Sequence, residues 1–185
     1  MEQGTIRSDR WNEAAKYGLI FGAISAAYLY LGHIQVALGV SGAFASILGF
    51  VLWAGKLTGC IMLMKHVMGK FYLKHPESVT SDIFRLGVLI ALLSALVYSV
   101  VAVADMLYVF PEYYDAVYTA VIEEYAKVLP VQQVDELRTV LVDAPKFTFI
   151  GNFIYCFLFG TILSLILSRN IHSKDPFSNY KQDEQ

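Results

Sequence analysis

Ionisable side chains inside apolar stretches are the first candidates for chemistry, because a charge at the centre of a membrane-spanning helix costs about 2.5–3.5 kcal/mol on insertion scales. Lys56 lies in such a stretch and shares about a quarter of a helix circumference with three bases that follow it. Clustered bases between helices can recognise an anionic lipid headgroup or a polyprenyl phosphate. The predicted headgroup-binding residues are Lys56, His66, Lys70 and Lys74.

The same basic stripe has two other interpretations. Lys56 precedes Met64, where the apolar block ends, by eight residues, or about 12 Å at 1.5 Å per residue, and a lysine stem can cover much of that distance by snorkelling. The later bases would then anchor the helix at the cytoplasmic surface. Alternatively, Lys56 is a counter-ion inside a helix bundle.

Asp105 is the second intramembrane polar residue. It lies five residues before Phe110, which places it within about 8 Å of the opposite membrane surface. We expect no ion pair between Lys56 and Asp105, because they differ in depth by about 10 Å in a hydrocarbon core about 30 Å thick. The expected partners of Asp105 are His33, Tyr108 or the start of the last apolar block.

Tyrosines gather in the polar segment 111–145. Tyr114, Tyr118 and Tyr125 fall along one face of a predicted helix. Tyrosine favours the membrane–water boundary because its ring is apolar and its tip is polar. This face either rests on the extracytoplasmic surface of the membrane or docks a protein partner.

No residue pattern predicts catalysis, a metal site or a cofactor. The sequence has no phosphate-binding glycine loop, zinc-protease motif or Ser–His–Asp order. Its four histidines lack partners at metal-binding intervals, and the adjacent Glu123 and Glu124 would point about 100° apart on a helix. Asp82 and Arg85, three residues apart, are expected to form a pair within one helix.

Composition identifies the elements that carry these residues. The chain has 185 residues, of which 56% are hydrophobic and only 16% charged, with a mean hydropathy of +0.51. Soluble domains carry about 25% charged residues. The net charge of −2 implies no nucleic-acid partner. Four apolar blocks are long enough to cross a bilayer, which needs about 20 residues, so we expect an all-α polytopic membrane protein with a four-transmembrane-helix bundle.

A single membrane domain is expected over residues 1–170, followed by a mobile cytoplasmic tail over 171–185. Segment 111–145 has too many charges and prolines to span the membrane. It is predicted to form an extracytoplasmic amphipathic helical hairpin, with Pro111 in the first turn of its first helix and Pro130 ending that helix. The expected spanning helices are about 13–33, 43–69, 83–110 and 147–168.

Basic residues predict the orientation. Ten of the 14 Lys and Arg residues fall in the N-terminal tail, the segment from Lys65 to Arg85, and the C-terminal tail. Segment 111–145 contains only Lys127 and Arg138. Since cytoplasmic loops carry the excess of bases, both termini are expected in the cytoplasm and the hairpin on the other side.

Small residues at four-residue spacing predict where the helices touch, because close backbone approach drives helix association in lipid. Every apolar block carries such a stripe, which favours packing within one bundle over a homodimer face. The stripes are Gly18, Gly22 and Ala26; Gly55 and Gly59; Ala91, Ala95 and Ser99; and Gly160, Ser164 and Ser168.

The aromatic-rich segment Trp11–Gly18 (WNEAAKYG), the four spans and the long segment before the last span together resemble a family of small membrane proteins of unknown function found mainly in Bacteroidetes. The likeness covers nearly the whole chain. It implies a bacterial inner membrane and a polytopic fold, and it assigns no site residue.

These observations favour a non-catalytic accessory or scaffold subunit for a membrane or envelope partner. The partner would bind through the outer hairpin or the basic cytoplasmic helix end. A small oligomeric transporter or channel, and a protein that binds a lipid headgroup or polyprenyl phosphate, are the alternatives. A lipid-modifying enzyme that uses Asp105 and the outer acids is a third hypothesis.

Overall fold

The computed structural model describes residues 2–39 and 42–172, in which all regular structure is helical. The prediction of an all-α protein is thereby confirmed, as is the number of helices long and apolar enough to cross a membrane. These four helices are α1 (Glu2–Ala37), α2 (Gly42–Lys74), α3 (Thr80–Ala104) and α6 (Ala144–His172). The remaining elements are the π-helical turn η1 (Asp105–Val109) and the shorter helices α4 (Pro111–Ala126) and α5 (Val131–Val142).

The spanning helices extend beyond the expected bounds. α1 begins at Glu2 rather than near residue 13, and α2 continues to Lys74 rather than ending at 69. The hydrogen bonds of a helix are internal, so it need not end where its apolar stretch ends. Of the expected tail over 171–185, Ile171 and His172 are the last residues of α6, and the rest lies outside the described residues.

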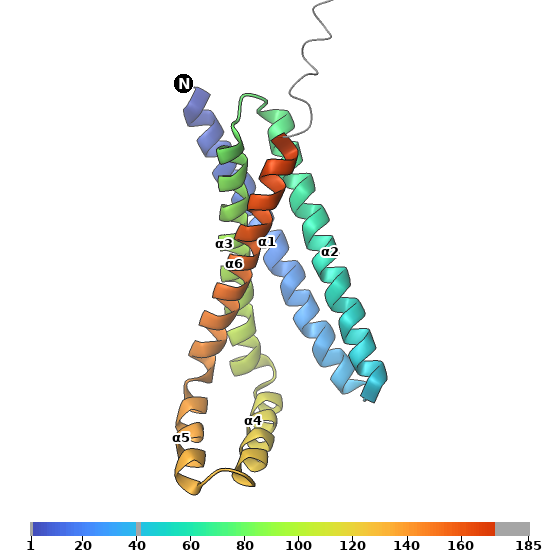
Figure 1. The fold of residues 1–185 in the computed structure, drawn as a ribbon, viewed down its shortest axis with the longest axis vertical. Coiled ribbons are helices and arrows are strands. Elements are labelled where there is room, and N and C mark those ends of the chain that lie inside the picture. The colour runs from blue at the N-terminus through green and yellow to red at the C-terminus, as the bar shows by residue number, and fades with distance from the viewer. Residues whose placement is uncertain (1, 40–41, 173–185) are drawn as a thin grey trace, which may run out of the picture.

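The helices are arranged so that α1 begins and α6 ends at one end of the bundle, while α4 and α5 form the other (Figure 1). α1 and α3 run parallel along their length, since Arg10 contacts Asp82 near one end and His33 contacts Asp105 near the other. Towards the end where α1 and α2 are connected, α2 lies away from α3 and α6 (Figure 1), whereas α1 stays beside the end of the third span, where His33 meets Asp105. The bundle is therefore tight at one end and open at the other.

The apolar core lies in the tight half. α2 contributes buried residues only from its last third, namely Met64, Val67, Met68 and Phe71. They pack with side chains of α1, α3 and α6, among them Phe21, Ile83, Leu86 and Leu167. None of the described residues in the first two thirds of α2 is buried, so this part of α2 shows its apolar side chains to the outside.

Glycines set the closest helix contacts. A Cβ atom added at Gly22 would lie 2.6 Å from the Val97 Cβ, and one added at Gly160 would lie 2.6 Å from the Ala91 Cβ. These distances leave no room for a side chain at either glycine. The predicted small-residue stripes of α1, α3 and α6 are thus confirmed as packing surfaces.

The stripe predicted on α2 is wrong. Nothing lies within 4 Å of a Cβ added at Gly59, and the Tyr28 hydroxyl is 3.8 Å from one added at Gly55. Spacing identifies a smooth stripe on a helix, but it cannot tell whether another helix covers that stripe. Here α2 stands too far from its neighbours.

A wide helical turn ends the third span. The Phe110 N–H donates to the carbonyl of Asp105 at 2.9 Å, five residues earlier, which is the π-helical pattern. Pro111 then occupies the first turn of α4, as predicted, where its missing N–H costs no hydrogen bond. This turn directs the Asp105 side chain to the interior, where it is fully buried.

Candidate functional site

The residues of the predicted basic stripe on α2 lie in different environments. The Lys56 ammonium lies 6.0 Å from the ring centre of Tyr28 on α1 and 5.0 Å from that of Tyr98 on α3. It borders a hollow between these helices. This geometry favours a lysine that lines a cavity over one that snorkels to the surface.

The other three residues of the stripe lie nearer the end of α2. Lys74 donates a 2.7 Å hydrogen bond to Asp9 of α1, whereas His66 and Lys70 are exposed. The four side chains therefore do not line one pocket among the described residues. Headgroup binding by this complete set stays a prediction.

Asp105 is held by two donors from other elements. Its Oδ2 lies 2.7 Å from the His33 Nε2 of α1 and accepts a 2.9 Å hydrogen bond from the Tyr114 hydroxyl of α4. His33 was among its expected partners, while Tyr114 was not. The described part of the chain shows no ion pair between Lys56 and Asp105, as expected from their depths.

Aromatic rings surround the imidazole of His33. The Phe110 ring centre is 4.6 Å away, and that of Tyr113 is 5.1 Å away, edge to face. Burial and the hydrogen bond to Asp105 raise the pKa of the Tyr114 hydroxyl well above its ordinary value, because both disfavour the phenolate. Tyr114 therefore remains a protonated donor, and this cluster fastens α1, η1 and α4 together.

The three tyrosines predicted to dock a partner differ in exposure. Tyr114 bonds Asp105, and the Tyr118 hydroxyl lies 3.7 Å from the Met106 sulfur, so both face inward. Burial raises the pKa of Tyr118 as well. Tyr125 is exposed. Docking of a partner on this face stays a prediction, with Tyr125 as its accessible residue.

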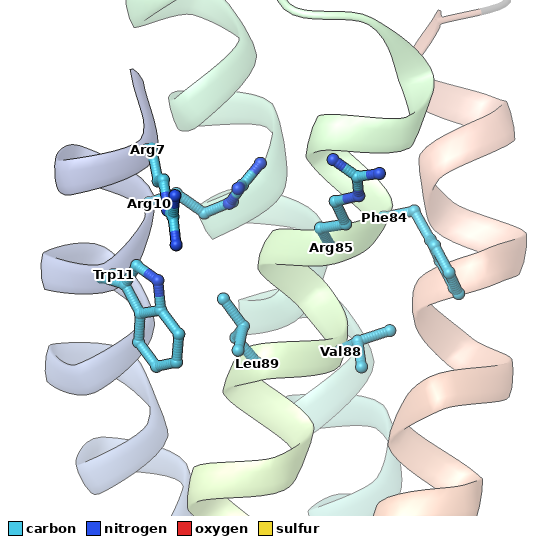
Figure 2. A pocket seen from close by; sticks show the side chains of 7 residues that line it. All are labelled: Arg7, Arg10, Trp11, Phe84, Arg85, Val88 and Leu89. Atoms are coloured by element: carbon cyan, nitrogen blue, oxygen red, sulfur yellow. The ribbon is translucent and has the colours of Figure 1, made fainter. Parts of the chain in front are cut away.

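A cleft lined by arginines lies at the tight end of the bundle, between α1 and α3. It has a volume of about 500 Å³. In Figure 2, Arg7 and Arg10 project from α1 while Arg85 projects from α3 at a similar height, and Trp11 and Leu89 lie below them. We call this site the arginine cleft; its lining residues are Arg7, Arg10, Trp11, Phe84, Arg85, Val88 and Leu89.

The charges of the arginine cleft are only partly balanced. Arg10 donates to Asp82 at 2.8 Å, so the expected Asp82–Arg85 pair within α3 is wrong: the parallel packing of α1 on α3 brings Arg10 to that carboxylate. The Arg10 Nε is buried without a hydrogen-bond partner in the described residues. Arg7 and Arg85 have no carboxylate within ion-pair distance in the same ranges.

The arginine cleft combines cations at its rim with an apolar floor. Because α1 and α3 both run inward from this end, Trp11 and Leu89 lie deeper than the guanidinium groups (Figure 2). A second hollow of about 330 Å³ shares Arg7, Arg10 and Arg85. The site suits a ligand with an anionic head and an apolar body.

In the sequence these arginines indicate orientation only, and their spacing does not reveal the site. Arg10 and Arg85 are 75 residues apart in the chain. The signal that could have joined them is the small-residue stripe of α1, since its Gly18 and Gly22 rest on Leu93 and Val97 of α3. That register also brings Arg10 beside Asp82, one turn before Arg85.

No family model, curated protein or solved structure matches this chain. In residues 2–39 and 42–172, no three His, Cys, Asp or Glu side chains lie close enough together to hold a metal ion.

Proposed function

We propose that this chain is a non-catalytic membrane protein that binds the headgroup of an anionic phospholipid in the arginine cleft. The observation that carries the proposal is the placement of three guanidinium groups from two helices above an apolar floor. Guanidinium groups bind phosphate oxygens through paired hydrogen bonds. Basic pockets between transmembrane helices are a known physical basis for lipid-headgroup recognition.

The balance of charge supports an anionic ligand. Asp82 neutralises one of the three arginines, so two positive charges remain for a phosphate. The Nε of Arg10 is buried and makes no hydrogen bond within the described residues. Beneath them, Trp11, Val88 and Leu89 offer an apolar surface to acyl chains.

The orientation inferred from the basic residues supports the same ligand. With both termini in the cytoplasm of a bacterial cell, the arginine cleft faces the cytoplasmic leaflet of the inner membrane and α4 and α5 lie outside the cytoplasm. Anionic lipids give that leaflet a negative surface. The inner-membrane location is the one that the resemblance to the Bacteroidetes family implies.

An accessory role remains part of the proposal. A lipid held in the arginine cleft would let the chain position or stabilise a membrane or envelope partner. The exposed Tyr125 and the uncovered first two thirds of α2 are the surfaces open to such a partner or to a second copy of the chain. The transporter or channel hypothesis stays an alternative without a specific supporting contact.

Trp11 provides a direct test. Trp53→Phe leaves Trp11, inside the arginine cleft, as the sole tryptophan of the chain. In phosphatidylcholine nanodiscs, phosphatidylglycerol with brominated chains should quench Trp11 fluorescence more than brominated phosphatidylcholine does. Arg7→Gln with Arg85→Gln should weaken phosphatidylglycerol binding about 30-fold, since each base contributes about 1 kcal/mol.

The matched control removes two exposed bases at the same end of the bundle, outside the arginine cleft: Lys65→Gln with Arg169→Gln. This pair should retain the preference for phosphatidylglycerol. Equal quenching by both lipids, or equal losses in the two double variants, would rule out a specific headgroup site.

A further inference from the structure

Lys56 is deeply placed in the membrane-spanning part of the chain. It lies 14 residues from Gly42, where α2 begins, and eight from Met64, where its apolar stretch ends, about 21 Å and 12 Å along the helix at 1.5 Å per residue. It borders a hollow of about 320 Å³ at the junction of α1, α2 and α3. We call this site the Lys56 hollow; its lining residues are Tyr28, Leu29, Gly32, Gln35, Gly49, Leu52, Trp53, Lys56 and Tyr98.

The charge of Lys56 has no anionic partner within the described residues. The nearby carboxylate in the same half of the bundle, Asp105, is already bound by His33 and Tyr114. The rings of Tyr28 and Tyr98 stabilise a cation only partly, by about 0.5–2 kcal/mol per contact. An uncompensated ammonium at this depth is costly, so the Lys56 hollow favours an anion.

A second donor borders the same hollow. The Nε2 of Gln35 is buried and makes no hydrogen bond within residues 2–39 and 42–172. A buried donor without a partner costs about 1–3 kcal/mol. The same hollow is thus bordered by an ammonium without an anionic partner and by a residue with an unpaired amide N–H.

The Lys56 hollow is open to the bilayer rather than enclosed by packed helices. Its α2 wall comes from the part of that helix without buried residues. A Cβ added at Gly32 or Gly49 would meet nothing within 4 Å. Small-molecule sites have volumes of about 300–1,000 Å³, so this hollow fits the head of a single-chain amphiphile that enters sideways from the lipid.

From these observations we propose that the Lys56 hollow binds the carboxylate of a membrane-dissolved, single-chain fatty acid. One ammonium balances one carboxylate, whereas a doubly charged phosphate would leave a net negative charge at this depth. The site is independent of the arginine cleft. It consists of other residues, lies deeper in the bundle, and has one lysine in place of the arginines. The acid chain extends into the gap between α1 and α2 and the surrounding lipid.

Trp53 lines the Lys56 hollow and makes the proposal measurable. Trp11→Phe leaves Trp53 as the sole tryptophan, so this assay and that of the arginine cleft read different residues and fail separately. The full chain is placed in phosphatidylcholine nanodiscs and titrated with dibromostearate or with its methyl ester. The ester measures quenching by simple partition into the bilayer, and the acid should quench Trp53 in excess of it, saturably.

Lys56→Met should lower the affinity for dibromostearate, measured from the excess quenching of Trp53, about tenfold or more, because the charged hydrogen bond is lost. Lys56→Arg should retain it, and so should Lys65→Met, which removes an exposed base of the same helix. Gly49→Leu keeps the charge but fills the hollow, so it should also abolish the excess, even if Lys56→Met does not fold. Equal quenching by acid and ester, or excess quenching that persists in both Lys56→Met and Gly49→Leu, would overturn the proposal.

Discussion

Asp105 illustrates how a carboxylate is stabilised inside an apolar bundle. It is fully buried and accepts hydrogen bonds from His33 and Tyr114, which belong to two other helices. Hydrogen bonds to charged groups contribute about 1.5–3 kcal/mol each. A side chain of this kind therefore fixes the position of the elements that donate to it.

Tyr114→Phe should lower the free energy of unfolding by about 1.5 kcal/mol, because it removes one donor to Asp105 without changing the ring. The measurement is an SDS titration followed by circular dichroism. Tyr113→Phe is the matched control, since the Tyr113 hydroxyl makes no hydrogen bond within the described residues while its ring contacts His33. A similar loss in both variants would contradict the role given to Tyr114.

The raised pKa of Tyr114 also predicts a pH dependence. Above its unfolded value of 10.0, the unfolded chain releases the phenol proton while the folded chain keeps it. The folded state then binds more protons, so stability falls as the pH rises. The advantage of the wild type over Tyr114→Phe should be constant below about pH 10 and shrink above it.

Helix contacts in this bundle depend on the absence of side chains. Gly18 and Gly22 of α1 leave space for Leu93 and Val97 of α3, and the same holds for Gly160 of α6 against Ala91. Without a hydrophobic driving force in lipid, such close approach supplies the packing energy. α2 makes fewer contacts of this kind and relies on the buried residues of its last third.

Gly22→Ala should destabilise the protein by about 1–3 kcal/mol, because the added methyl group would lie 2.6 Å from the Val97 Cβ and force α1 and α3 apart. Gly59→Ala makes the same change on α2 where nothing lies within 4 Å, and alanine favours the helix. It should leave stability unchanged or raised. Thermal unfolding in mild detergent compares the two, and equal losses would contradict the packing of α1 on α3.

The bundle as a whole separates two polar sites along its length. The arginine cleft lies between α1 and α3 at the tight end with the packed core, and the Lys56 hollow lies between α1, α3 and the part of α2 whose described residues are not buried. At the first site the ion pair with Asp82 holds Arg10 in place. The open side of the second leaves a route from the lipid. This difference matches a firmly held headgroup in one case and an exchanging amphiphile in the other.

The orientation of the bundle can be tested with single cysteines. In a background in which Cys60 and Cys156 are replaced by serine, Glu123→Cys and Lys70→Cys are exposed positions at opposite ends. With both termini in the cytoplasm, a membrane-impermeant maleimide should label the cysteine at 123 on intact cells. It should label the cysteine at 70 only after permeabilisation. The reverse pattern would place the arginine cleft on the outer side.

Hydropathy was sufficient to predict four spanning helices, because about 20 apolar residues cross a bilayer whatever their order. The depths of Lys56 and Asp105 followed from residue counting, since a helix rises by a constant 1.5 Å per residue. His33 could be named as a partner of Asp105 because both lie near the same surface. Tyr114 was not predicted as a partner of Asp105, because the π-helical turn that brings α4 back to Asp105 has no local signature in the sequence.

The sites depend on which helix faces which, and spacing along one helix does not carry that information. Gly22 and Gly59 belong to similar stripes, yet a neighbouring helix covers the first and leaves the second open. Arg10 and Arg85 line one cleft, with Asp82 bound to Arg10, only because α1 packs parallel to α3 in that register. Composition and periodicity therefore determine that this chain has four helices long and apolar enough to cross a membrane, whereas the packing of its helices determines where its unbalanced charges lie.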